Sequence, residues 1–171
     1  MNPQTLIHRT AGTNCDGELA NAFELAIDRG VPMFGTCNGF QILATLGLLP
    51  DPHAGVQEVT LADNASGRYI DRWTPIQVVA DSKCIWTKGL EDHDLPMAHA
   101  EGRFTAPDDV LDRIEANGQV ALRYKDNPNG SARDIAGICD PTGMVFGLMP
   151  HPERFQHPTN HPQWTRMGED F

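Results

Sequence analysis

The sequence predicts an α/β fold with an open, mostly parallel sheet flanked by helices. Two observations carry this prediction. Strand and helix signals alternate in the first 50 residues, and a helical segment lies between two short apolar segments, residues 5–8 and 31–35. Two strands on either side of a helix form a right-handed βαβ unit, and the strands of such a unit are parallel.

The first helix is expected to follow a polar turn and to end near Arg29. Leu19, Phe23 and Ile27 are spaced four residues apart, which places them on one face of a helix. Gly30 follows directly and is suited to a C-terminal cap. The strand at residues 31–35 then completes the βαβ unit.

The rest of the chain is richer in strand signals. Further helices are predicted at residues 39–46 and 107–117, the latter with Pro107 near its first turn. Strands are predicted at residues 56–61, 76–79, 96–99, 120–124, 134–139 and 144–148, the last two forming a hairpin. The tail after Phe155 is expected to be irregular. No repeat or linker interrupts the chain, so a single domain over residues 1–171 is expected.

Composition narrows the class of protein. The 171 residues carry a net charge of -10, which disfavours a nucleic-acid partner because phosphate backbones are also negative. No apolar run is long enough to span a membrane, and no secretory signal is recognised at the start of the sequence. The four cysteines form no C-x-x-C pair and are expected to be reduced thiols. A cytoplasmic location is therefore expected.

Residues 35–39, with the sequence GTCNG, are typical of a nucleophile elbow. They follow an apolar strand and open a helix, so Cys37 would project above the sheet at a sharp turn. Gly35 and Gly39 are expected to remove Cβ atoms that would collide there, and the helix N-terminus is expected to favour the thiolate. A buried structural thiol is the alternative for Cys37. Cys15 is a rival nucleophile, but it lacks the paired glycines.

His151 and Glu153 are the candidate base and its orienting carboxylate. They follow the strand predicted at residues 144–148, and sites in open α/β sheets gather at the carboxyl ends of strands. Their spacing lets both side chains point the same way in an extended segment, so that Glu153 can accept one imidazole proton while the other nitrogen serves Cys37. The alternatives are a solvated surface loop and a metal site that includes His157 and His161.

These segments resemble the class I glutamine amidotransferases. The form CNGFQ at residues 37–41 is similar to the purine-biosynthesis branch of that family in particular. Further matching segments are residues 9–16, 66–68, 71–73, 86–89, 99–104, 118–148 and 149–154, so the resemblance covers nearly the whole chain. It implies a flavodoxin-like fold and glutamine hydrolysis. Cys37 would form a glutamyl thioester, His151 would be the acid-base and Glu153 its orienter.

The same resemblance implies the binding residues and the partners. Gly35, Asn38 and Gln41 would lie at the glutamine site, where the backbone N–H of Asn38 is one oxyanion donor. The ammonia would pass to a synthetase subunit, possibly accompanied by a small third subunit. That synthetase uses ATP and magnesium to convert formylglycinamide ribonucleotide to formylglycinamidine ribonucleotide in purine biosynthesis. No metal or other cofactor is implied in this chain.

The chain departs from the family pattern mainly between Ala26 and Ile27. The family has further strands there, including a Pro-Gly-Gly-Phe loop that supplies the second oxyanion donor, and this sequence has none of them. The resemblance therefore implies a truncated domain with weak or absent activity, since one oxyanion donor contributes about 10²–10³ in turnover. Two alternatives remain: a non-catalytic subunit that binds the synthetase, and a related amidotransferase that feeds another synthetase. Thr36 and Ala100 are smaller departures.

Overall fold

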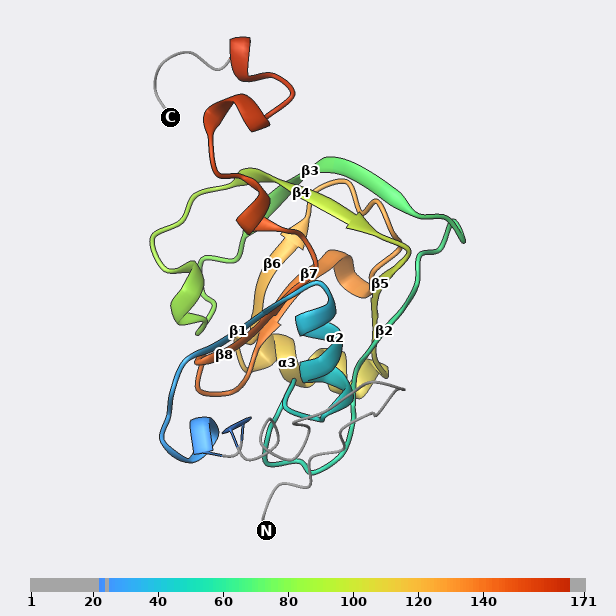
Figure 1. Cartoon of the computed structure of the whole chain (residues 1–171). Helices are drawn as coiled ribbons and strands as arrows, with labels where there is room; N and C mark the ends of the chain where they lie inside the picture. The colour runs from blue at the N-terminus through green and yellow to red at the C-terminus, as the bar shows by residue number, and fades with distance from the viewer. Residues whose placement is uncertain (1–21, 24, 167–171) are drawn as a thin grey trace, which may run out of the picture.

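The computed structural model describes residues 22–23 and 25–166, in which one six-stranded sheet carries most of the chain (Figure 1). The strand predicted at residues 5–8, the start of the first helix and Cys15 lie outside the described residues. Residues 25–28 are helical, as the four-residue apolar spacing predicts.

The strand order of the main sheet is β1-β8-β7-β6-β3-β4. Its strands are β1 (Met33–Thr36), β3 (Ile70–Val78), β4 (His93–His99), β6 (Val120–Tyr124), β7 (Ile135–Cys139) and β8 (Val145–Leu148). A second sheet pairs β2 (Thr60–Asp63) with β5 (Glu101–Thr105), and the helices are α2 (Asn38–Thr45) and α3 (Asp108–Ala116). The α/β fold class is thereby confirmed.

The prediction that the sheet is mostly parallel is wrong. Only β1 and β8 pair in parallel; the other neighbours within the described sheet are antiparallel. Parallel neighbours need a crossover, usually an α-helix, whereas the connections β3–β4, β6–β7 and β7–β8 contain no α-helix. Because the antiparallel strands alternate, β1, β8, β6 and β4 nevertheless run in the same direction. Their carboxyl ends therefore lie along one edge of the sheet.

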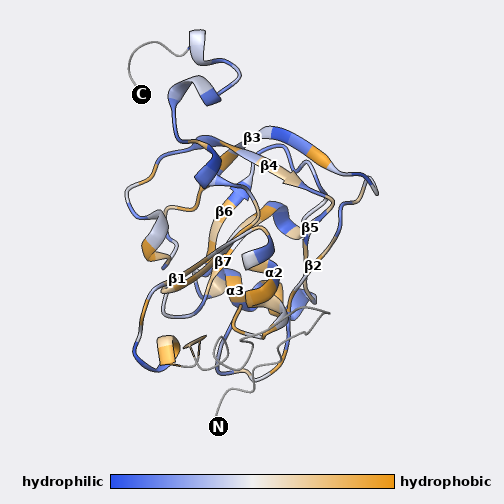
Figure 2. Ribbon diagram, in the orientation of Figure 1, coloured by the Kyte–Doolittle hydropathy of each residue, from blue (hydrophilic) through white to orange (hydrophobic). Residues whose placement is uncertain are grey.

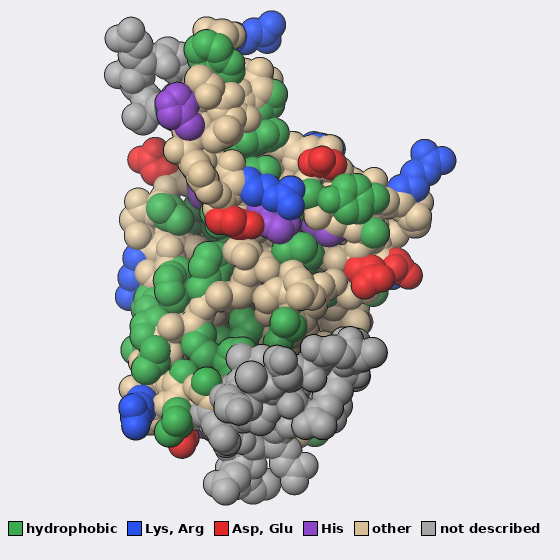
Figure 3. Space-filling model, in the orientation of Figure 1, with side chains coloured by type: hydrophobic (Ala, Val, Ile, Leu, Met, Phe, Trp, Pro, Cys, Tyr) green, Lys and Arg blue, Asp and Glu red, His purple; other side chains and the backbone are tan. Residues whose placement is uncertain are grey.

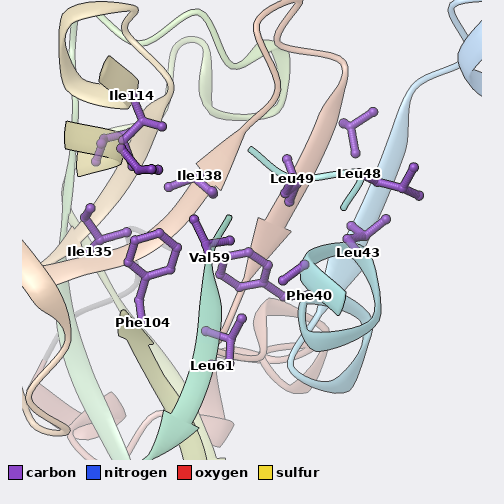
Figure 4. Close-up of a cluster of buried hydrophobic side chains, with 14 of the residues drawn as sticks. Phe40, Leu43, Leu48, Leu49, Val59, Leu61, Phe104, Ile114, Ile135 and Ile138 are labelled. Carbon is purple, nitrogen blue, oxygen red and sulfur yellow. The ribbon is translucent and has the colours of Figure 1, made fainter. Parts of the chain in front are cut away.

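Helices α2 and α3 pack against one face of the sheet. Phe40 and Leu43 of α2 and Ile114 of α3 are buried in one apolar cluster with Phe104 of β5 (Figure 4). The rings of Phe40 and Phe104 stack with centroids 6.1 Å apart. Figure 2 shows a strongly hydrophobic part of α2, while much of β3 is coloured as hydrophilic. None of the described helices is long and apolar enough to cross a membrane.

The opposite face of the sheet holds a second apolar cluster that includes Met97, Tyr124 and Phe146, to which neither α2 nor α3 contributes a residue. At its margin Phe34 stacks on Phe146 and contacts Trp86, and Phe34 and Trp86 are still 42% and 39% exposed. Figure 3 shows hydrophobic side chains gathered on the side where Figure 1 places β1 and β8. The sheet is therefore covered by helices on one face only, within the part of the chain that the structure describes.

Strand boundaries differ most from prediction around Pro75. The strand predicted at residues 76–79 begins earlier in the structure, at Ile70. In the structure β3 passes through Pro75, where β6 does not yet pair with it. β6 pairs with β3 from Ile76 onward, whereas β4 pairs with residues 70–76. The hairpin of β7 and β8 and the position of β6 are as predicted.

Candidate active site

Cys37 forms the turn between β1 and α2. Its φ is 50° and its ψ -108°, an unusual conformation for a residue other than glycine. Its N–H donates to the carbonyl of Leu148 at 2.7 Å, and its carbonyl accepts the N–H of Gln41 at 3.1 Å. The same residue thus ends the pairing of β1 with β8 and begins α2, which is the strained elbow that the sequence predicts.

Two glycines allow α2 to lie directly on the sheet. A Cβ atom on Gly35 would be 2.7 Å from the carbonyl carbon of Gly39, and one on Gly147 would be 2.1 Å from the Phe40 ring. Gly35 and Gly147 are register partners in β1 and β8, so no side chain of either residue separates the helix from the sheet at this point. The steric reason expected for Gly39 is wrong, because a Cβ atom there would meet nothing within 4 Å.

His151 and Glu153 are paired, as the sequence predicts. The Nδ1 atom of His151 is 2.5 Å from Oε1 of Glu153, and the backbone N–H of His151 donates to Pro96 of β4 at 2.7 Å. A carboxylate accepts hydrogen bonds only, so Nδ1 carries the proton and Nε2 of the neutral ring holds a lone pair. This Nε2 atom is buried and has no hydrogen-bond partner among the described residues.

Burial and nearby charged residues change the pKa of the Cys37 thiol. Burial raises the pKa of Cys37, while the backbone N–H of Asn38 and the charge of Arg154 lower it and the charge of Glu153 raises it. The expected preference for thiolate is thus wrong for this structure, because desolvation of the half-buried sulfur outweighs the helix N-terminus. The thiol therefore needs a base, and two of the charges that act on it belong to residues 153 and 154, close in sequence to His151.

The other predicted binding residues lie around the elbow. Asn38 directs its backbone N–H to the Cys37 sulfur. The side-chain amide of Gln41 donates to the carbonyl of Glu101 at 3.0 Å, which links α2 to the start of β5. Gly35 is buried beneath the helix. Their contact with glutamine stays a prediction.

The histidines of the tail are engaged elsewhere. His161 is buried, bonds to Asp94 through Nε2 at 3.2 Å and packs on Trp73, while Nδ1 of His157 bonds to Thr159 at 2.9 Å. Among the described residues, no group of three or more His, Cys, Asp or Glu side chains is placed to hold a metal ion.

Two residues that shape this edge of the sheet were not predicted from the sequence. Gly147 could have been found, because an isolated glycine inside a strand indicates close approach of another backbone or ring. Asn64, which bonds to His99 of β4, gave no signal, since 35 residues separate the two.

We expect Cys37 to be the most reactive of the described cysteines toward iodoacetamide. Cys37 is half-buried, whereas Cys84 and Cys139 are 0% exposed. Because the folded-state pKa of Cys37 is raised, its thiolate fraction, and so its alkylation rate, should still be rising above pH 9. Peptide mass spectrometry after timed alkylation at several pH values measures both. A rate that levels off below pH 7, or faster labelling of Cys84, would contradict this expectation.

Comparison with known proteins agrees with the geometry. Residues 26–170 match the model of the CobB/CobQ-like glutamine amidotransferase domain. The chain is 40% identical over 159 residues to the phosphoribosylformylglycinamidine synthase subunit PurQ of Dehalococcoides mccartyi, covering 89% of this chain and 61% of that protein. It is 48% identical over 131 residues to PurQ of Mycobacterium tuberculosis, covering 75% and 54%.

Solved structures give the same result. The structure of PurLQS from Thermotoga maritima matches with a TM-score of 0.66 and 36% identity, covering 84% of this chain and 62% of that one. A glutamine amidotransferase from the same organism matches with a TM-score of 0.54 and 15% identity, over 93% of this chain and 57% of that one, which supports the fold alone. The chain therefore spans little more than half the length of the relatives that it matches.

Proposed function

Because the chain belongs to the CobB/CobQ-like glutamine amidotransferase family, we propose that it derives from, and acts as, a glutaminase subunit that supplies ammonia for purine biosynthesis. The observation that carries this proposal is the placement of Cys37 on a strained elbow at the sheet edge that also holds the His151–Glu153 pair. The 40% identity to a phosphoribosylformylglycinamidine synthase subunit supports the choice of pathway.

The chemistry follows from the roles of these groups. Nε2 of His151 takes the Cys37 proton, and the sulfur attacks the carboxamide carbon of glutamine. The N–H of Asn38 stabilises the resulting oxyanion. When the carbon–nitrogen bond breaks, His151 returns the proton to the leaving amine, which departs as ammonia and leaves a glutamyl thioester. A water that gives its proton to His151 then hydrolyses the thioester to glutamate and restores the thiol.

The proposal includes a partner. The ammonia would pass to a synthetase subunit that uses ATP and magnesium to make formylglycinamidine ribonucleotide, with a small third subunit in the complex. The solved PurLQS structure, at 36% identity, supports such an assembly. We assign no metal or cofactor to this chain itself, and we place it in the cytoplasm, where its free thiols would remain reduced.

The domain is proposed to be a single truncated unit that lacks strands between Ala26 and Ile27. Support comes from β1, the strand that precedes the nucleophile, which lies at an end of the described sheet. The coverage of 54–62% of the relatives' length supports it too. This shortening favours one alternative function, a subunit that binds the synthetase without turning over glutamine.

Glutamine hydrolysis by the purified chain with its synthetase partner tests the proposal. We expect turnover about 10²–10³ below that of a full-length relative, because one oxyanion donor is missing, and we expect Cys37→Ala to abolish it. Complex formation without any turnover would establish the alternative. Turnover that survives Cys37→Ala would refute the nucleophile.

A further inference from the structure

A third imidazole lies at the sheet edge that holds Cys37 and His151. His99 is the last residue of β4, which runs in the same direction as β1 and β8, and it is only 4% exposed. The segment that carries His151 contacts the same strand, because the backbone N–H of His151 donates to the carbonyl of Pro96 in β4 at 2.7 Å and the charge of His151 acts on His99. The site described above gives His99 no role.

The contacts of Asn64 determine which ring nitrogen of His99 carries a proton. The side-chain NH₂ of Asn64 donates to the carbonyls of Arg68 at 2.9 Å and His99 at 2.8 Å. Both of its donors are thereby engaged, so its Oδ1 atom faces Nδ1 of His99 at 3.1 Å. Since Oδ1 only accepts, Nδ1 of His99 must donate. In the neutral ring, Nε2 then carries a lone pair and no proton.

The surroundings keep this ring in place and neutral. A Cβ atom on Gly102 would lie 2.5 Å from the His99 ring and 2.6 Å from the methyl of Met149, so the ring is closely packed. Burial, and then the positive charge that His151 carries when it is protonated, lower the pKa of His99 to about 4. At neutral pH the ring therefore accepts hydrogen bonds at Nε2 and does not compete with His151 for a proton.

Nε2 of His99 is buried without a hydrogen-bond partner among the described residues, and so is Nε2 of His151. A buried acceptor without a partner is costly, and two of them at the same end of the sheet call for a ligand that brings N–H donors. A primary carboxamide brings two on one nitrogen, and ammonia brings three. We propose that Nε2 of His99 accepts an N–H of the glutamine carboxamide and then of the ammonia released from it. This inference rests on the proposed glutaminase function.

Glutamine binding tests it in a Cys37→Ser background, in which bound glutamine is not consumed. His99→Asn keeps an N–H donor for Asn64 and removes the distal acceptor. Calorimetric titration with L-glutamine should give a dissociation constant about tenfold higher, as expected for one lost hydrogen bond. His93→Asn is the matched control, because Nδ1 of His93 bonds to the carbonyl of Glu91 at the other end of β4. Its affinity should match that of Cys37→Ser alone.

A spectroscopic measurement on the Cys37→Ser chain does not depend on how well His99→Asn folds. With ¹⁵N-labelled histidine, the Nε2 resonance of His99 should be that of an unprotonated nitrogen at neutral pH. It should move toward the hydrogen-bonded position when glutamine is added. Glutamine binding with no such movement, or with equal affinity in His99→Asn, would overturn the inference alone. Failure of the Cys37→Ser chain to bind glutamine would overturn the proposed function together with it.

Discussion

Gly35→Ala should lower the free energy of unfolding by about 2–3 kcal/mol, because the new methyl group has no room beneath α2. Its Cβ atom would lie 2.7 and 2.8 Å from the carbonyl carbon and oxygen of Gly39. These are backbone atoms of a helix, which cannot rotate away as a side chain can. The helix would have to lift from the sheet, and the elbow that places Cys37 would move with it. Urea denaturation followed by circular dichroism measures the change.

Gly39→Ala is the matched control, two residues beyond the nucleophile on the other side. A Cβ atom there meets no atom within 4 Å, and alanine is preferred to glycine in a helix by about 1 kcal/mol. The free energy of unfolding should therefore stay the same or rise. Equal losses of stability in the two variants would show that the close packing of α2 on the sheet is not what requires Gly35.

Glu153→Gln should slow reaction at Cys37 by about 10²–10³, since the corresponding change in a serine-protease triad costs about 10⁴ and Glu153 is less buried. The Glu153 side chain is 53% exposed and holds Nδ1 of His151 at 2.5 Å. A glutamine can present its NH₂ group to Nδ1 and favour the tautomer whose Nε2 carries the proton. The base would then be blocked while the ring stays in place.

The rate of covalent labelling by a glutamine-like electrophile measures this effect without requiring a full catalytic cycle. Glu91→Gln is the control, because Glu91 is an exposed residue in the segment before β4. Its labelling rate should be unchanged. A reduction of less than about threefold in Glu153→Gln would mean that the carboxylate does not orient the base.

Local patterns in the sequence predicted the parts of the site that depend on neighbouring residues. The elbow at Cys37 and the pairing of His151 with Glu153 each lie within five residues of chain, so spacing and residue type were sufficient. The same is true of α2 and of the hairpin between β7 and β8, where turn residues separate two apolar runs.

Long-range packing determined what the sequence did not predict. The direction of β3 and β6 depends on which strands they pair with, and the contact of Asn64 with His99 spans 35 residues. The pKa of Cys37 is raised because folding buries its sulfur, which a motif does not reveal. Gly39 belongs to the motif but has open space around its Cα, whereas Gly147, outside the motif, is the residue that touches Phe40.

Covalent trapping tests most directly whether Cys37 is a nucleophile served by His151. The chain is incubated with a diazoketone analogue of glutamine, and the modified peptide is identified by mass spectrometry. The geometry predicts one adduct, on Cys37, which is absent in Cys37→Ala and forms much more slowly in His151→Asn. An adduct on Cys15, or labelling of Cys37 at an unchanged rate without the imidazole, would contradict it.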